Sequence, residues 1–240
     1  MIKITEISII VPMYNEEKRA PKFLNELINF SKKNLKNYEL IFVDDGSKDK
    51  TLDMCKAFKT KNIKIKIISY KKNQGKGFAV KTGVFNAKGE KIIFIDADGS
   101  IPPEEISKML RKLSKYDVVV GNRSSKKSVI KQSNIRKVTG TSFNILVNIL
   151  FKININDNLC GFKGFKKEVA CNLFKELIDK RWLFDVELFY KIKKKKYSLY
   201  RLPIVWEHKT GSKIKFFDPI IMMLKLINLR IKLLKKPSKI

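Results

Sequence analysis

Hydrophobic runs and helical periodicities alternate regularly along the first half of the chain. Five largely apolar runs, each bounded by polar or turn residues, predict strands at residues 7–14, 38–47, 63–70, 91–100 and 116–124. Segments with apolar residues at helical spacing lie between them and predict helices within residues 16–34, 49–60, 75–89 and 102–115. Asp49 is placed to cap the second helix, and Gly89 to close the third.

Regular alternation of strands and helices predicts an α/β fold with a mostly parallel central sheet flanked by helices. Ligands of such sheets bind at the carboxyl ends of the strands. Asp44 and Asp45 end the second predicted strand, and Asp96 and Asp98 end the fourth. Like charges gathered at one edge repel each other unless a cation or hydrogen-bond donors neutralise them. Helix capping accounts for one such acid but hardly for all four, so we expect a ligand site here.

The alternation is less regular in the second half of the chain. Residues 124–139 are polar and basic and predict a loop, and residues 139–151 have the spacing of an amphipathic helix. A glycine-hinged stretch at residues 160–177 is expected to lead into a helix, and residues 181–209 predict a helix followed by a strand. No internal repeat interrupts this organisation.

The C-terminal segment, residues 216–236, is apolar but is interrupted by Lys225, Arg230 and Lys232. No stretch reaches about 18 uninterrupted apolar residues, so we expect no membrane-spanning helix. The pattern fits a helix that lies in a membrane interface with cationic flanks, or a helix packed on the domain core. The apolar run at the N-terminus is too short for a signal peptide and predicts a first strand instead.

The charge balance changes the list of possible partners. The chain of 240 residues contains 52 Lys and Arg against 23 Asp and Glu, a formal net charge of +29. Nucleic acid, an anionic membrane face and phosphorylated substrates all fit this charge, as does a general compositional bias towards Lys and Ile. Aromatic residues do not interleave with basic ones on a strand platform, and no helix-turn-helix or RNP pattern is present, which disfavours nucleic acid.

Cysteine and histidine usage narrows the chemistry further. The three cysteines are scattered, which indicates reduced thiols in a cytosolic compartment, and a single histidine excludes a multi-histidine metal site. The glycine-rich phosphate motifs are also absent, so a bound diphosphate needs another device. A divalent cation held by acids fits, because Mg²⁺ and Mn²⁺ prefer oxygen ligands. Asp96 and Asp98 lie on the same side of an extended backbone, so one acid can bind metal while the other orients sugar or ribose hydroxyls.

Several segments in order resemble one enzyme family. Family 2 glycosyltransferases of the GT-A fold are similar to the segments SIIVPMYNEE, IFVDDGSKDKT, NQGKGFAVKTG and IIFIDADGSIPPEEI. The dolichyl-phosphate glucosyltransferase branch, related to dolichyl-phosphate mannose synthases, resembles the later segments NLCGFKGFKKEVA, RWLFDVELFYKIK and VWEHKTGSKI. The resemblance covers about residues 7–235. It implies a transferase domain at 1–213, with a nucleotide-sugar half at 1–123 and an acceptor half at 124–213, followed by a membrane-associated helix at 214–240.

The resemblance also implies residue roles. The nucleotide pocket would be lined by Pro12, Tyr14 and Glu16, and the base held by Val43 and Asp45. Ribose, sugar and metal would be contacted by Asp96, Ala97 and Asp98, with Asp98 as direct metal ligand. Ser100 would be a second metal contact, although mannose synthases often carry a longer glutamine there. Phosphates would be met by Arg123, Arg136 and Lys213, while His208 stands where mannose synthases tend to carry arginine, in a phosphate or a structural role.

The implied reaction is inversion at the anomeric carbon. Charge that develops on the leaving diphosphate would be neutralised by the metal and by basic residues. An acceptor phosphate is already anionic and needs little general-base help. Asp157 and Asp185 are candidates for orienting the acceptor, or for acting as base if the acceptor is a hydroxyl. Asp185 lies between apolar residues, where a carboxylate needs a partner, and Arg181 four residues earlier is one candidate.

These observations predict a peripheral membrane enzyme on the cytoplasmic side of the membrane. It would transfer a hexose, glucose from UDP-glucose, onto dolichyl or another polyprenyl phosphate with Mg²⁺ or Mn²⁺. The alternatives are a GDP-mannose-dependent dolichyl-phosphate mannose synthase and a family 2 transferase with a protein or glycan acceptor. A sugar-nucleotide-binding protein without activity is disfavoured by the intact pair Asp96 and Asp98.

Overall fold

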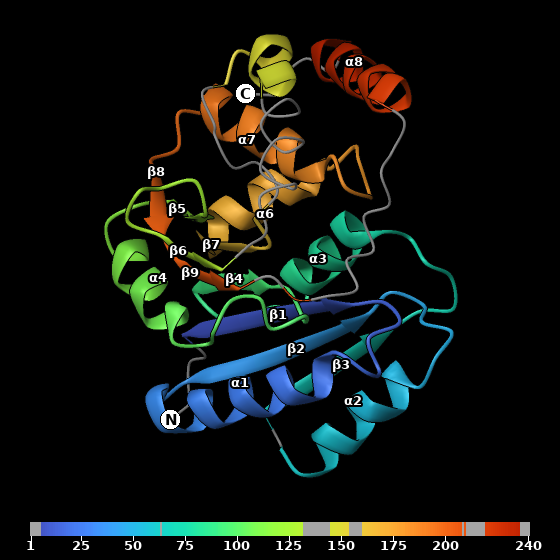
Figure 1. Ribbon diagram of the computed structural model, residues 1–240, viewed down its shortest axis with the longest axis vertical. Helices are drawn as coiled ribbons and strands as arrows, with labels where there is room; N and C mark the ends of the chain where they lie inside the picture. Colours follow the sequence, from blue (N-terminus) through green and yellow to red (C-terminus); the bar gives the residue numbers. More distant parts are fainter. Residues whose placement is uncertain are drawn as a thin grey trace.

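A seven-stranded mixed sheet forms the centre of the computed structural model, in the strand order β3-β2-β1-β4-β7-β5-β8 (Figure 1). The structure describes residues 6–62, 64–131, 145–153, 160–207, 209 and 219–235. The strands of this sheet are β1 (Ile7–Met13), β2 (Tyr38–Asp44), β3 (Ile65–Ser69), β4 (Lys91–Ile95), β5 (Val118–Asn122), β7 (Phe162–Lys166) and β8 (Leu199–Pro203). A second, two-stranded sheet consists of β6 (Val129–Lys131) and β9 (Val205–Glu207).

Helices cover both faces of the large sheet. They are α1 (Ala20–Asn34), α2 (Thr51–Thr60), α3 (Lys76–Phe85), α4 (Glu105–Leu113), α6 (Lys167–Lys175), α7 (Phe184–Lys194) and α8 (Pro219–Lys235), and residues 145–151 are also helical. One core cluster joins the sheet to α1, α2 and α4, and the other joins it to α3, α6, α7, α8 and residues 145–151. Neighbouring residues of β1 alternate between the clusters, with Ile9 in one and Ile10 in the other, because successive side chains of a strand point to opposite faces.

The predicted α/β fold and its mostly parallel sheet are confirmed. Strand β1 pairs in parallel with β2 and β4, β2 with β3, and β5 with β8. Only β7 is antiparallel to its two neighbours in this sheet, β4 and β5. The interpretation of residues 160–177 as a glycine hinge that leads into a helix was wrong for the hinge, because strand β7 lies there. The expected helix is α6. Gly164 lies inside β7, where an added Cβ would stand 2.6 Å from Met109 Sδ, so this glycine serves close packing against α4.

Two predicted helix boundaries also need correction. Helix α2 begins after Lys50 rather than after Asp49, although the Asp49 carboxylate still accepts the Thr51 N–H at 3.0 Å. Helix α3 ends at Phe85, and its capping residue is Asn86, so Gly89 does not close it. Gly89 instead packs against the backbone of β1, where an added Cβ would lie 2.5 Å from Ser8 N.

Helix α8 combines the two alternatives that its sequence left open. Its side chains Leu226, Leu229 and Leu233 are buried against the core. Another stripe of the same helix is exposed and apolar, formed by Leu224, Ile227, Ile231 and Leu234. Among the residues that the structure describes, no helix is both long enough and apolar enough to cross a membrane.

The second half of the predicted transferase domain contributes to the same sheet as the first half. Strands β7 and β8 both follow residue 124, and β7 lies between β4 and β5 of the first half. The division at residue 123 is therefore a proposed division of function within one sheet. Residues 132–139 of the predicted basic loop lie outside the described residues.

Candidate functional site

The predicted acids lie at one rim of the central sheet. Asp44 ends β2, and Asp45 follows it; Asp96 and Asp98 follow β4. Strand β1 lies between β2 and β4, so the three parallel strands bring their carboxyl ends to the same edge. The antiparallel strand β7 begins at this edge, and the Asp96 N–H donates to the carbonyl of Gly161 at 3.0 Å. The rim is thus formed by segments far apart in the sequence.

Asp45 binds the loop that precedes α3. Its Oδ2 accepts from Asn73 Nδ2 at 2.7 Å and from the Gly75 N–H at 2.9 Å, and its Oδ1 accepts from the Gln74 N–H at 2.8 Å. Burial raises the pKa of Asp45, and the donors from Gln74 and Gly75 oppose that rise. The carboxylate therefore fixes the loop, and any bound base meets an acid that is already largely engaged.

Asp44 has a structural role in the same turn. Its Oδ1 accepts from the Ser47 N–H at 3.1 Å, and its Oδ2 accepts from Ser69 Oγ at 2.8 Å. The first bond closes the turn after β2, and the second ties the end of β2 to the end of β3. Asp44 is buried, and its bonds account for a carboxylate that capping alone does not explain.

Asp96 forms an ion pair that the sequence did not reveal. Lys76 Nζ, at the first residue of α3, lies 2.6 Å from Asp96 Oδ1 and 2.8 Å from Oδ2. Only 15% of the Lys76 side chain is exposed. Burial by itself lowers the pKa of Lys76, but the carboxylates of Asp96, Asp185 and Asp98 together outweigh it and raise that pKa. Lys76 is therefore a fixed cation beside the acids.

The surroundings also shift the pKa of Asp96. Burial raises the pKa of Asp96, with Lys76 opposing and the negative charge of Asp98 reinforcing the rise.

Gly161 provides the space for the Asp96 carboxylate. A Cβ added at Gly161 would stand 1.8 Å from Asp96 Oδ2 and 2.2 Å from its Cγ. Glycine at position 161 is thus required by the position of the Asp96 side chain.

Asp98 lies in the turn after β4. Its Oδ1 accepts from the Ser100 N–H at 2.9 Å, and Gly99 between them has φ of 70°, a left-handed conformation that favours glycine. Asp98 is partly exposed, whereas Ser100 is buried and its carbonyl accepts from the Glu207 N–H at 2.9 Å. The turn therefore presents Asp98, the proposed metal ligand, at the surface of the rim.

Asp185 is buried at the start of α7, and its ion-pair partner is Lys163. The Lys163 ammonium lies 2.7 Å from Asp185 Oδ1, and both side chains are almost fully buried. Lys163 also donates to the carbonyl of Cys160 at 2.6 Å, and its ammonium lies 5.4 Å from the centre of the Phe94 ring and 5.5 Å from that of Phe189. The expected partner Arg181 was wrong, because a lysine from β7 reaches the carboxylate through the core.

The remaining predicted residues are found in varied surroundings. Glu16 is buried and forms a two-bond contact with Arg19, Ala97 is buried, and Val43 has no exposed surface. Pro12 and Tyr14 are partly exposed at the end of β1. Arg123 follows β5, with its guanidinium 5.4 Å from the centre of the Trp206 ring. Four predicted residues lie outside the described part of the chain: Arg136, Asp157, His208 and Lys213.

The sequence offered only weak signals for the residues that it missed. Lys76 belongs to the segment NQGKG, whose glycines indicated a loop but not the direction of the lysine. Lys163 and Gly161 belong to the stretch CGFKGF, in which a buried cation on a strand has no pattern of its own. Pairing between β4 and β7 brings Gly161 and Lys163 beside β4, whereas Lys76 reaches the rim from the start of α3.

The acids of the rim suit a metal cation whose coordination is completed by oxygen atoms of the substrate. Within the described residues, no cluster of three or more His, Cys, Asp or Glu side chains could hold a metal alone. Mg²⁺ and Mn²⁺ are often bound by one or two carboxylates together with substrate phosphates and water. Asp98, partly exposed and with its Oδ1 accepting a hydrogen bond from the Ser100 N–H of its own turn, suits that mode.

The fold is of the GT-A type. The structure of glucosyl-3-phosphoglycerate synthase from Mycobacterium tuberculosis, in complex with Mn²⁺, UDP and phosphoglyceric acid, is similar to it with a TM-score of 0.71. The match covers 98% of this chain and 80% of that one at 15% sequence identity, a level that supports the fold.

The chain belongs to glycosyltransferase family 2, because the family model for glycosyl transferase family 2 matches residues 8–174. A dolichyl-phosphate beta-glucosyltransferase of Dictyostelium discoideum is 36% identical over 234 residues, which is 91% of this chain and 72% of that protein. The Homo sapiens protein with the same description is 35% identical over 225 residues, covering 87% of this chain and 69% of its own. The family and branch expected from the sequence are thereby confirmed.

Proposed function

We propose that this enzyme transfers glucose from UDP-glucose onto the phosphate of dolichol or another polyprenol, with inversion at the anomeric carbon. The observation that carries the proposal is the acid pair Asp96 and Asp98 at the strand ends, with Lys76 fixed beside it. The dolichyl-phosphate beta-glucosyltransferases that match along about nine tenths of the chain support the choice of sugar and acceptor.

The residues of the rim suit a reaction in which negative charge develops on the leaving group. An oxygen of the acceptor phosphate attacks the anomeric carbon, the bond from that carbon to the diphosphate breaks, and the nucleotide diphosphate leaves with an added negative charge. Asp98 would hold Mg²⁺ or Mn²⁺, which when bound neutralises the charge on the leaving diphosphate. Lys76 supplies a second positive charge, held in place before the reaction by Asp96.

Asp185 has a supporting role in this mechanism. Its charge acts on both Lys76 and Asp96, and Lys163 neutralises it from the side of the core. The acceptor phosphate is anionic at neutral pH and needs no strong base, so orientation and charge stabilisation supply most of the rate. Arg123, Arg136 and Lys213 complete the proposal as phosphate-binding residues, and Asp157 as a residue that orients the acceptor.

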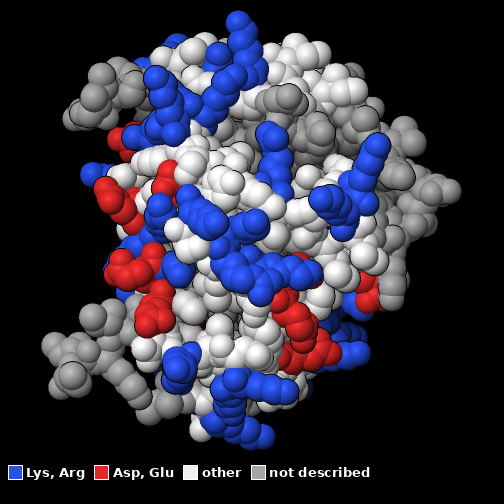
Figure 2. Space-filling view, turned by 90° about the vertical axis from the view of Figure 1, so that its left-hand side faces the viewer, with Lys and Arg blue, Asp and Glu red and all other residues white. Residues whose placement is uncertain are grey.

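The surface suits an enzyme that works on a lipid at a membrane face. Figure 2 shows Lys and Arg side chains spread over one side of the molecule, with smaller groups of acids between them. The exposed apolar stripe of α8 runs beside a polar stripe that contains Lys225, Lys232 and Lys235. A helix of this kind lies in the interface plane, where lysines attract anionic lipids. We therefore propose peripheral binding to the cytoplasmic face.

A donor screen tests the proposal. Purified protein is incubated with Mn²⁺ or Mg²⁺, a polyprenyl phosphate and either UDP-glucose or GDP-mannose, and the lipid product is measured. We expect transfer from UDP-glucose, loss of transfer with EDTA, and recovery when Mn²⁺ is added. Transfer from GDP-mannose alone would contradict the proposed donor, and activity on a free sugar without any lipid product would contradict the proposed acceptor.

A substitution tests the metal ligand. Asp98→Ala should lower kcat/KM by about 100-fold or more, since it removes the group that anchors the charge-neutralising cation. Asp53→Ala is the matched control, because Asp53 is exposed on α2 and forms only a loose pair with Lys56 at 3.6 Å. Unchanged activity of Asp98→Ala would show that the site has been assigned wrongly.

A further inference from the structure

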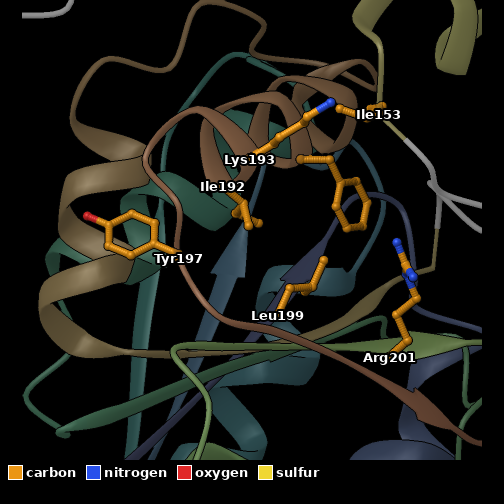
Figure 3. Close-up of a pocket in the computed structure, with 7 residues that line it drawn as sticks. Ile153, Ile192, Lys193, Tyr197, Leu199 and Arg201 are labelled. Atoms are coloured by element: carbon orange, nitrogen blue, oxygen red, sulfur yellow. The ribbon is translucent and has the colours of Figure 1, made fainter.

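Two cavities lie side by side near the C-terminal end of α7, and they share Lys193. One has a volume of about 280 Å³ and is lined by Phe151, Lys152, Tyr190, Lys193, Lys194 and Arg230. The other has a volume of about 270 Å³ and is mainly apolar, with lining residues Ile153, Phe189, Ile192, Lys193, Tyr197, Leu199 and Arg201. In Figure 3 the charged ends of Lys193 and Arg201 lie on one side of the second cavity, whereas the Tyr197 hydroxyl points away.

The first cavity has the composition of an anion site. Four of its six lining residues are cations, and none is an acid. The shared Lys193 ammonium makes a close contact with the carbonyl of Lys152, so this charge is held at the wall between the two cavities. The side chains of Lys152 and Lys194, which also line the cavity, are exposed to solvent. Four like charges around one cavity repel each other until an anion enters.

Arg230 is the built part of this site. Its guanidinium lies 4.9 Å from the centre of the Tyr190 ring and 5.9 Å from that of Phe151, so two aromatic side chains hold it in place. Its Nη1 atom is buried and has no hydrogen-bond acceptor among the residues that the structure describes. An unpaired buried donor costs free energy. Arg230 is also a lining residue of the cavity, and arginine is well suited to bind phosphate oxygens through its several N–H donors.

This site is separate from the catalytic rim. Asp185 lies near the rim at the start of α7, and Lys194 is the last residue of the same helix. Nine residues of α-helix span roughly 13 Å at 1.5 Å per residue. One phosphate cannot occupy both places, so the reacting phosphate of the acceptor is not the anion of this cavity.

The surroundings of the cavity favour a lipid headgroup over a free phosphate. Arg230 belongs to α8, and Ile227 and Ile231 of its exposed apolar stripe lie within one turn of it. Residues 145–151 add two more exposed apolar side chains, Ile145 and Ile149, just before Phe151 in the cavity wall. An anion site beside an exposed apolar surface suits a molecule with a charged head and hydrocarbon chains.

We propose that the cavity formed by Phe151, Lys152, Tyr190, Lys193, Lys194 and Arg230 binds the phosphate of an anionic phospholipid. The apolar stripe of α8 enters the same lipid layer, and the site orients the enzyme on the membrane. This inference rests on the membrane part of the proposed function and adds a specific headgroup site to it.

Vesicle binding tests the headgroup site. The full chain is floated with vesicles of phosphatidylcholine, either pure or with 30% phosphatidylglycerol. The double variant Lys152→Gln with Lys194→Gln should bind the anionic vesicles roughly 30-fold more weakly, since each of the two cations near such a surface contributes about 1 kcal/mol. The double variant Lys59→Gln with Lys61→Gln is the control, because it removes the same charge from exposed positions at the end of α2.

Two further measurements separate the possible outcomes. Arg230→Gln should weaken anionic-vesicle binding about fivefold and leave binding to pure phosphatidylcholine unchanged. Equal losses in the two double variants would overturn the site, because they indicate diffuse charge attraction. The site would also be overturned if the double variant Lys152→Gln with Lys194→Gln lost binding of inorganic phosphate but kept its binding to anionic vesicles, because this identifies a free-phosphate site.

The proposed chemistry is tested separately with a short-chain, water-soluble prenyl phosphate in the absence of vesicles. Glucose transfer to this acceptor, combined with no preference for anionic vesicles, would overturn the headgroup site and leave the proposed reaction standing. Selective vesicle binding without transfer from any donor would support the site and contradict the proposed reaction.

Discussion

Gly161→Ala is the substitution with the most specific expected effect. The added Cβ would stand 1.8 Å from Asp96 Oδ2, 2.2 Å from Cγ and 2.6 Å from Oδ1. Van der Waals contacts have their optimum near 3.5–4.0 Å, so the carboxylate must move by roughly 1.7 Å or more. A shift of that size breaks its contacts of 2.6 and 2.8 Å with Lys76 Nζ.

The expected magnitudes follow from this displacement. Overpacking of a buried site costs about 1–3 kcal/mol of the free energy of unfolding. Misplacement of a catalytic group by about 1 Å lowers the rate about 100-fold. We therefore expect Gly161→Ala to fold, to unfold at lower urea concentration, and to lose about 100-fold in kcat/KM for glucosyl transfer.

A double-mutant cycle isolates the cause. Asp96→Ala removes the atoms that the new Cβ would meet, so Gly161→Ala should cost less than about 0.5 kcal/mol in that background. Gly164→Ala is the matched control, because its Cβ would meet Met109 Sδ at 2.6 Å and its cost should be the same in both backgrounds. Equal destabilisation by Gly161→Ala with and without the Asp96 side chain would refute the reasoning, as would full activity of the single variant.

Three other predictions concern buried or paired groups. Lys163→Met should lower the free energy of unfolding by about 3–5 kcal/mol, because it leaves the Asp185 charge buried without its lysine; a loss below about 1 kcal/mol in urea titrations would contradict this. The hydrogen bond from Lys166, with further help from Ser198, lowers the pKa of Asp117 to about 2. A lowered folded-state pKa means that the stabilisation is complete above the ordinary value near 3.9 and is lost as pH falls towards 2, so Asp117→Asn should flatten the stability profile between pH 4 and pH 2. Burial, with the charge of Asp44 adding to it, raises the pKa of Cys55 to about 12, so iodoacetamide at pH 8 should spare Cys55 in the folded protein, and its alkylation there by mass spectrometry would count against the structure.

The order of strands and helices in the first half followed from periodicity. The five predicted strands match β1 to β5, because each is a short, largely apolar run bounded by turn residues, and all except the edge strand β3 are mostly buried. The antiparallel strand β7 was missed because Lys163 and Gly164 interrupt its apolar pattern and Gly161 directly precedes it. Those glycines are explained by contacts with Asp96 and Met109, which belong to segments distant in the chain.

The predicted residues fared differently according to the range of the interactions that decide them. Asp96 and Asp98 could be placed at the rim because strand polarity alone sends the residues after β4 to one edge. The partner of Asp185 could not be found in the same way, because an i, i+4 rule considers only residues of its own helix, and Lys163 arrives from a different element.

The sequence by itself determined the alternating architecture, the family and the sheet edge at which the acids of the rim gather, because these depend on local pattern and strand direction. The tertiary structure alone decided which charges meet: Lys76 with Asp96, Lys163 with Asp185, and Arg230 with two aromatic rings. The physical reason is that ion pairing acts between side chains within a few ångströms in space. The number of residues between two side chains in the sequence does not tell how far apart they lie in space. The folded sheet decides this, because it brings β4, β7 and the start of α3 together.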